Sequence, residues 1–278
     1  MRVRSGALAL GQRTGWFALM VAMATIMAGC GLLSPRDDDR TAKMAPAEIH
    51  AAAKEELDSG RYGEAVKLLN KLESRYPFGI WAQQAQLDAA FAHYKNNDRA
   101  QALIAIDRFI RLYPNHPRLD YAYYLKGLIN FNDEQGVLQR LGGQDLAERD
   151  QIAAREAFEA FQIITKRFPN SVYAEDAQAR QRYLRNTMAA GELYVAHYYF
   201  SRKAFIAAIV RAQTVVEQYD DTPASEEALA LMIRAYDQLG MTAQRDDAQR
   251  VLQHNFPNSH FLKDASLVDR SSRWAFWR

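Results

Sequence analysis

Apolar residues recur along most of this chain at the spacing of one face of an α-helix. Positions 12, 8 and 5 before Pro77 hold Ala65, Leu69 and Leu72, which share a side when the segment is helical. The same offsets before later turns give further apolar sets: Ala102, Ile106 and Phe109, then Ala157, Phe161 and Ile164, then Ala208, Ala212 and Val215. A fifth set, Arg245, Gln249 and Leu252, fits poorly at its start. The pattern predicts an amphipathic helix before each turn.

An aromatic residue followed by proline, or once by aspartate, marks the end of each of these helices. The five steps are Tyr76-Pro77, Tyr113-Pro114, Phe168-Pro169, Tyr219-Asp220 and Phe256-Pro257, at spacings of 37, 55, 51 and 37 residues. Proline stops a helix because it lacks the backbone N–H and its ring clashes with the preceding turn. Upstream of each of these helices lies another helical pattern, for example Ile49, Ala53 and Leu57 before the turn at Gly60.

This order of helix, turn, helix and proline is similar to the tetratricopeptide repeat (TPR), whose unit has about 34 residues. We therefore predict an all-α fold, a TPR superhelix of about five helix-turn-helix repeats. The alternative is an ordinary helical bundle with coincidental prolines, which would not explain the matching internal spacings.

The two long intervals predict insertions and a division of the array. Residues 132–150 hold three glycines and are expected to form a loop within the third repeat. Residues 171–200 hold no proline and one glycine, which predicts a long helix. We expect repeats 1–3 in residues 45–170, and the long helix with repeats 4–5 in residues 171–262. Residues 263–278, with Trp274, Phe276 and Trp277, form a tail that is more simply a frayed end than a docking peptide.

The N-terminus has the layout of an export signal. Three arginines within the first 13 residues precede an apolar run over 16–28, which is shorter than the about 20 residues that span a bilayer. The run ends in Ala28-Gly29-Cys30, which resembles the lipobox of bacterial lipoproteins, although Met27 stands where leucine is usual. We expect a signal peptide over 1–29, lipidation of Cys30 and a flexible tether over 30–44. The alternative is a plain signal peptide with an incidental thiol.

Composition and motifs argue against several classes of function. Lys and Arg (35) nearly balance Asp and Glu (33), so the net charge of +2 gives no reason to expect nucleic acid as the main partner. A single cysteine excludes an internal disulfide framework and every multi-cysteine zinc site. No phosphate-binding loop, HExxH pair or GxSxG elbow is present in the sequence. We therefore expect no enzyme activity, no metal and no cofactor, and a groove that binds peptides.

Several segments are more specific than a general TPR pattern: 75–79 (RYPFG), 83–88, 94–96, 105–117 (AIDRFIRLYPNHP), 124–128, 168–171 and 196–199. They closely resemble the BamD family, the TPR lipoproteins of the β-barrel assembly machinery in the Gram-negative outer membrane. The resemblance covers about residues 45–260. Gly31, in place of an aspartate after the cysteine, implies the outer membrane and its periplasmic face.

The resemblance implies a non-enzymatic scaffold with three kinds of partner. They are the POTRA domains of the barrel component BamA, the other lipoproteins of the machinery, and unfolded outer-membrane protein precursors. It implies BamA binding by the C-terminal repeats through Arg211 and Arg202, although Arg211 as a solvated helix charge remains an alternative. Charge reversal at position 211 is expected to leave the fold intact, because helix propensity barely changes.

For the N-terminal repeats the resemblance implies precursor recognition. We expect the groove residues to be polar and aromatic side chains on the first helices of repeats, which line the concave side of TPR arrays: Gln84, Asp88, Tyr94, Tyr121 and Tyr124. Packing explains any single tyrosine among them about equally well. A different periplasmic TPR lipoprotein, for envelope division or pilus secretion, remains an alternative function, as does an enzyme accessory domain.

Overall fold

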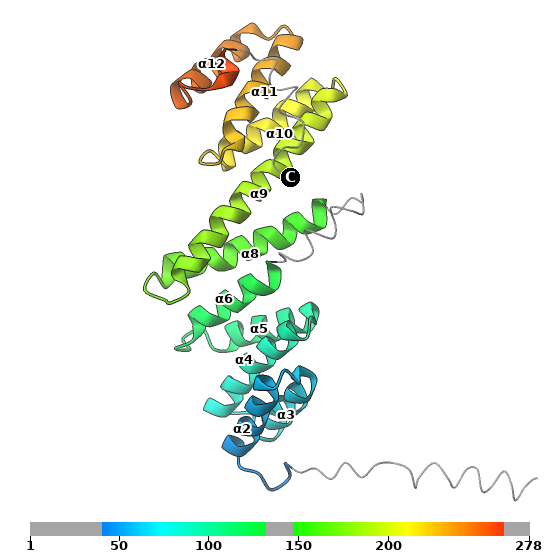
Figure 1. Cartoon of the computed structure of the whole chain (residues 1–278), viewed down its shortest axis with the longest axis vertical. Helices are drawn as coiled ribbons and strands as arrows, with labels where there is room; N and C mark the ends of the chain where they lie inside the picture. Colours follow the sequence, from blue (N-terminus) through cyan, green and yellow to red (C-terminus); the bar gives the residue numbers. More distant parts are fainter. Residues whose placement is uncertain (1–40, 132–146, 264–278) are drawn as a thin grey trace, which may run out of the picture. The chain divides into compact units, whose positions relative to one another are not determined.

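The computed structural model describes residues 41–131 and 147–263, and every regular element in these ranges is a helix (Figure 1). The α-helices are α2 (Pro46–Asp58), α3 (Tyr62–Arg75), α4 (Ile80–Lys95), α5 (Arg99–Leu112), α6 (Leu119–Asn130), α8 (Ala147–Arg167), α9 (Ala174–Ser201), α10 (Phe205–Gln218), α11 (Ala224–Gln238) and α12 (Thr242–Asn255). A short 3₁₀ helix, η2 (His260–Leu262), follows. These elements belong to the unit that begins at Pro46.

The helices form five pairs in chain order, as the sequence predicts. Each described helix packs against the next one, which gives the pairs α2/α3, α4/α5, α6/α8, α9/α10 and α11/α12 (Figure 1). The first helices of neighbouring pairs also contact each other, namely α2 with α4, α4 with α6, and α9 with α11. The predicted all-α repeat fold is therefore confirmed.

The five aromatic steps end their helices in the same way. The backbone N–H of Tyr76 donates to the carbonyl of Leu72 at 2.9 Å, one helical turn back. The equivalent bonds are Tyr113 to Phe109, Phe168 to Ile164, Tyr219 to Val215 and Phe256 to Leu252, all between 2.8 and 2.9 Å. Because Tyr219 makes this bond although aspartate follows it, the aromatic residue and not the proline is common to all five caps.

Small residues let the helices approach closely. Ala102 and Ala157, predicted at close helix contacts, are both completely buried. Gly127 on α6 is the most demanding case, since a Cβ there would lie 2.5 Å from Cε1 of Phe161 on α8. The close packing between these helices therefore depends on small side chains at a few positions.

Two details differ from the sequence-based expectation. A loop was expected over 132–150, but helix α8 begins at Ala147, and residues 132–146 lie outside the described residues. The segment 147–150 contains no glycine and begins with alanine, the best helix former. In the fifth repeat the buried positions of α12 are Ala248 and Leu252, while Gln249 is exposed.

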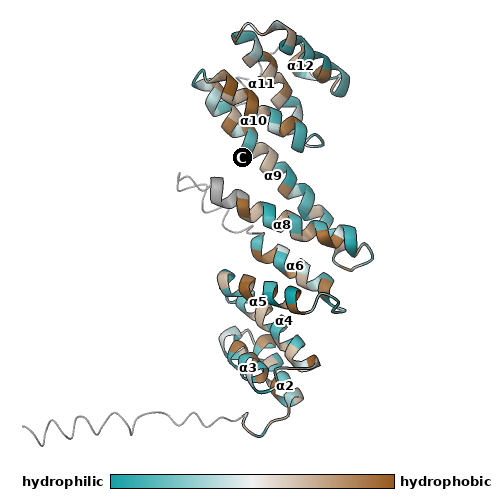
Figure 2. Cartoon of the chain, turned by 180° about the vertical axis from the view of Figure 1, so that it is seen from behind, coloured by the Kyte–Doolittle hydropathy of each residue, from teal (hydrophilic) through white to brown (hydrophobic). Residues whose placement is uncertain are grey.

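The long helix expected over 171–200 is confirmed as α9, which has 28 residues. It contacts α8, α10 and α11, so it joins the third repeat to the last two. The final helix, α12, is mostly hydrophilic in Figure 2 and buries only two residues. A polar last helix is typical of the capping repeat that ends a solenoid.

Candidate functional site

Three of the predicted groove residues, Gln84, Asp88 and Tyr94, lie on α4, a first helix. The amide of Gln84 donates to one oxygen of Asp88 at 2.7 Å, and the other oxygen lies 2.8 Å from Nε2 of His50 on α2. Asp88 therefore links the first helices of repeats 1 and 2, and His50 is a member of this network that the sequence did not single out. Tyr94 is half-buried and packs against the core of the second repeat.

The other two predicted groove residues, Tyr121 and Tyr124, lie on α6 and pack against the next repeat. The ring of Tyr124 stacks on that of Tyr173 at 4.6 Å between centroids, and its hydroxyl donates to Asp176 at 2.8 Å. Arg118 lies over the Tyr121 ring at 4.9 Å. Burial raises the pKa of Tyr121 to about 12. Both tyrosines thus have a packing role, whatever they bind.

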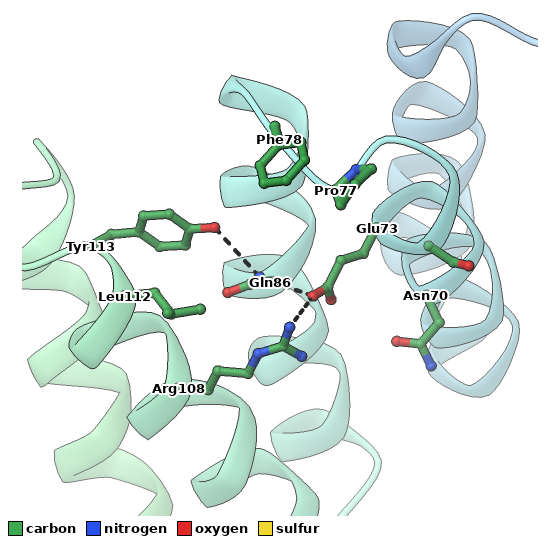
Figure 3. A pocket seen from close by; sticks show the side chains of 9 residues that line it. Asn70, Glu73, Pro77, Phe78, Gln86, Arg108, Leu112 and Tyr113 are labelled. Carbon is green, nitrogen blue, oxygen red and sulfur yellow. Dashed lines mark hydrogen bonds and ion pairs between the residues drawn. The ribbon is translucent and has the colours of Figure 1, made fainter.

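A groove of about 680 Å³ lies elsewhere, between the C-terminal ends of α3 and α5 (Figure 3). Its lining residues are Asn70, Glu73, Ser74, Pro77, Phe78, Gln86, Arg108, Leu112 and Tyr113. None of the five predicted groove residues is among them. Phe78, beside the proline that ends the first repeat, has 89% of its surface exposed, and Leu112 has 52%.

The floor of this groove is polar and partly unsatisfied. The amide nitrogen of Gln86, on α4, donates to Glu73 at 3.0 Å, and Arg108 is paired with the same carboxylate oxygen at 2.6 Å (Figure 3). Gln86 is almost fully buried, yet its Oε1 has no hydrogen-bond partner among the described residues. A buried acceptor without a donor is costly to the folded state.

The sequence contained one usable signal for this groove. Phe78 is an apolar residue within a Pro-Phe-Gly turn, outside the helical apolar period. The pairing of Glu73 with Arg108 joins α3 to α5 across α4, and no local pattern indicates it.

Arg211 and Arg202, the predicted partner-binding residues, are held by different neighbours. Arg211 on α10 donates from Nη1 to Oε2 of Glu192 on α9 at 3.0 Å. Its side chain is 45% exposed, while that of Glu192 is only 11% exposed. Arg202, at the C-terminal end of α9, lies over the Tyr198 ring at 5.4 Å. Arg211 is therefore not a simple solvated charge.

The Glu192 contact gives a physical reason to expect that Arg211→Glu also lowers stability, which helix propensity alone does not show. Helix propensity is indeed similar, but the variant would place a second carboxylate beside a buried one and remove its partner. Only the carboxylate of this pair is buried, so we expect a loss of stability that solvent at the half-exposed arginine reduces. Substitutions that keep a hydrogen-bond donor at position 211 are better probes of binding.

The remaining predicted site residue, Cys30, lies outside the described residues. Among the residues that are described, no helix is long and apolar enough to cross a membrane. The described residues also contain no group of three or more His, Cys, Asp or Glu side chains that could hold a metal ion.

Comparison with known proteins assigns the chain to a family. A family model described as outer membrane lipoprotein, YfiO, matches residues 42–252. The chain is 43% identical over 261 residues to the outer membrane protein assembly factor BamD of Neisseria meningitidis serogroup B, which covers 93% of this chain and 98% of that protein. It is 39% identical over 210 residues to BamD of Vibrio cholerae, covering 76% of this chain and 87% of that protein. The chain therefore belongs to the BamD (YfiO) family of outer membrane lipoproteins, the outer membrane protein assembly factors.

Proposed function

We propose that this protein is a non-enzymatic, lipid-anchored scaffold that binds BamA and assists the recognition and insertion of unfolded outer-membrane proteins. The observation that carries the proposal is the match over nearly the full length of a relative named as an outer membrane protein assembly factor. An array of five helix pairs supports it, since such arrays present extended surfaces for peptides and proteins.

The anchor is the diacylglyceryl-modified Cys30, and the protein faces the periplasm from the outer membrane. This part of the proposal rests on the lipobox-like sequence before Cys30 and on Gly31 after it. Two or more acyl chains make such an attachment stable.

BamA binding is assigned to the last two repeats, through Arg211 and Arg202. The half-exposed side chain of Arg211 supports this, because arginine binds carboxylates through two parallel hydrogen bonds. Ile206 and Val210, on the same helix, are 58% and 57% exposed and would contribute apolar contact area. Arginine is one of the residue types that are enriched in interface hot spots.

Precursor binding is assigned to the first three repeats. The concave side, with Gln84, Asp88, Tyr94, Tyr121 and Tyr124, is one candidate surface. The groove between α3 and α5 is the other. The exposed Phe78 favours it, because an extended chain could place an apolar side chain on that ring.

Purification of the tagged full-length protein from detergent-solubilised membranes tests the central proposal. BamA is expected as the dominant partner, together with other lipoproteins of the machinery. A different dominant partner, with BamA absent, would overturn the proposed function.

Photo-crosslinking tests the precursor surfaces. A crosslinking residue at position 78 probes the groove, and one at position 84 probes the concave side. Val251 is the control, because it is exposed on α12, outside the first three repeats. Precursor crosslinks no stronger at 78 or 84 than at 251 would remove the N-terminal repeats from precursor recognition.

A further inference from the structure

Glu192 is a buried acidic residue on α9. It lies among the buried side chains Met188, Ala189, Leu193 and Ala196 of the same helix. A carboxylate in such surroundings is costly unless it is paired. Its partner is Arg211, whose Nη1 lies 3.0 Å from Oε2 of Glu192.

The two side chains of the pair differ in exposure, and this difference suggests that the arginine can bind a second partner. The carboxylate is 11% exposed, whereas the arginine side chain is 45% exposed. A guanidinium has five N–H donors in a fixed plane. Within the described part of the chain, Glu192 is the partner found for Arg211, and it engages Nη1 alone. The remaining donors are therefore left for a ligand.

We propose that Glu192 is a positioning residue for the partner contact: it restrains the guanidinium of Arg211 so that the other donors meet a carboxylate of BamA. This inference rests on the proposed contact between Arg211 and BamA. Holding a long side chain in its bound conformation before the encounter lowers the entropy lost on binding. The buried partner supplies this restraint without occupying the whole guanidinium.

Two substitutions at position 192 separate position from charge. Glu192→Asp keeps the negative charge but withdraws the carboxylate by one methylene, so it no longer reaches Arg211. Glu192→Gln removes the charge but leaves an acceptor oxygen in the same place. Positioning predicts that the Asp variant binds BamA about five- to tenfold more weakly, while the Gln variant stays within about twofold of the wild type.

Glu227→Asp is the matched control. Glu227 on α11 is also a buried carboxylate, and it lies 2.9 Å from Nε2 of His197 on α9. The same shortening there should lower the melting temperature but change BamA affinity by less than about twofold. Equal losses of affinity in Glu192→Asp and Glu227→Asp would show a general effect on the fold and would overturn the proposal.

The measurement is the affinity of full-length protein for detergent-solubilised BamA, with circular dichroism of each variant. A weak Gln variant with an intact Asp variant would overturn positioning in favour of a charge effect. Arg211→Gln decides the underlying contact: if it binds BamA as the wild type does, the Arg211 contact fails, and positioning fails with it. If Arg211→Gln binds weakly but Glu192→Asp does not, positioning alone fails.

A second measurement needs no folded variant at position 192. With ¹⁵N-labelled arginine in the unliganded wild type, the guanidinium signals of Arg211 should show restricted rotation, whereas averaged signals typical of a free side chain would overturn the proposal. Arg211→Lys identifies these signals by their loss.

Discussion

Gly127 shows how far a single missing methyl group determines the fit of α6 on α8. A Cβ there would lie between 2.5 and 2.8 Å from three ring atoms of Phe161, which is completely buried. The ring cannot easily move, because Tyr124 and Phe131 lie against it at 6.0 and 6.2 Å between centroids. We expect Gly127→Ala to lower the free energy of unfolding by about 1–2 kcal/mol, although alanine is the better helix former.

Gly63 on α3 is the control, because a Cβ there would meet nothing within 4 Å. Gly63→Ala should raise the free energy of unfolding by up to about 1 kcal/mol. Urea unfolding of the full-length variants measures both changes. A shift in the same direction for both would mean that α6 and α8 are not in close contact at Gly127.

Tyr121 predicts a pH dependence at the alkaline end. Burial raises its pKa to about 12, whereas an unfolded tyrosine has a pKa of about 10. The folded protein therefore holds this proton more tightly, so the stabilisation is complete below pH 10 and is lost as the pH rises from about 10 to 12. Between pH 10 and 12 the free energy of unfolding of Tyr121→Phe should therefore fall by about 1–2 kcal/mol less than that of the wild type, after allowance for solvent screening.

Urea unfolding at pH 9, 10 and 11 checks the Tyr121 prediction, with Tyr76→Phe as a second tyrosine variant. Parallel stability curves for the wild type and Tyr121→Phe would contradict it.

For single residues, the sequence predicted which side chains are buried better than it predicted which side chains they contact. Ala102 and Ala157 follow from the three offsets before proline, because burial on a helix face is a local periodicity. The role of Glu192 could not be predicted in this way, because its partner lies on the next helix and the packing of the two helices determines which residues meet. The same reason hid the pairing of Glu73 with Arg108.

At the scale of the helix pair, alanine allows two backbones to approach. Ala102 on α5 and Ala157 on α8 are completely buried, so a leucine at either position would overpack the contact. We expect Ala102→Leu and Ala157→Leu each to cost about 1–3 kcal/mol of stability. Thermal melts of the full-length protein measure this cost.

Ala100, which is exposed on α5, is the control for the overpacking prediction. Ala100→Leu changes the same residue type on the same helix, but the stability measured from its melt should stay within about 0.5 kcal/mol of the wild type. Equal melts for Ala100→Leu and Ala102→Leu would show that the buried alanine tolerates the larger side chain.

Helix ends could be predicted from the sequence where a local signal, such as the aromatic residue before proline, marks them. The aromatic cap bonds occur at all five expected steps, including the one without proline. The start of α8 at Ala147 was missed, because three glycines upstream indicated a loop without indicating where it ends. In α12 the buried face is carried by Ala248, one position from the expected Gln249, and the weak apolar period there left the register open.

At the scale of the whole molecule, the number of repeats came from the sequence, but the ties between them did not. His50 with Asp88 joins the first helices of repeats 1 and 2, and His197 with Glu227 joins those of repeats 4 and 5. Each repeat buries its apolar face only against a neighbour, so these polar contacts add to a core that is already shared. The α3–α5 groove likewise arises between repeats, which is why no single repeat revealed it.

The last prediction concerns how the protein stays at the membrane. Cys30 is the only cysteine, and it follows an apolar run of 13 residues that is too short to span a bilayer. Cys30→Ser removes the acceptor thiol, so no acyl chains can be attached. We expect the variant to accumulate as an uncleaved precursor or as soluble periplasmic protein, because stable anchoring needs two or more chains. Fractionation of cells after a high-salt wash measures this.

Binding to BamA could keep the Ser variant in the outer-membrane fraction without any lipid. The experiment is therefore repeated with Cys30→Ser combined with Arg211→Gln, which weakens the proposed BamA contact. If the single variant stays with the membrane and the double variant is released, binding to BamA is what retains the unlipidated protein. If both variants stay after a wash that dissociates the complex, lipidation of Cys30 is not what holds the protein at the membrane.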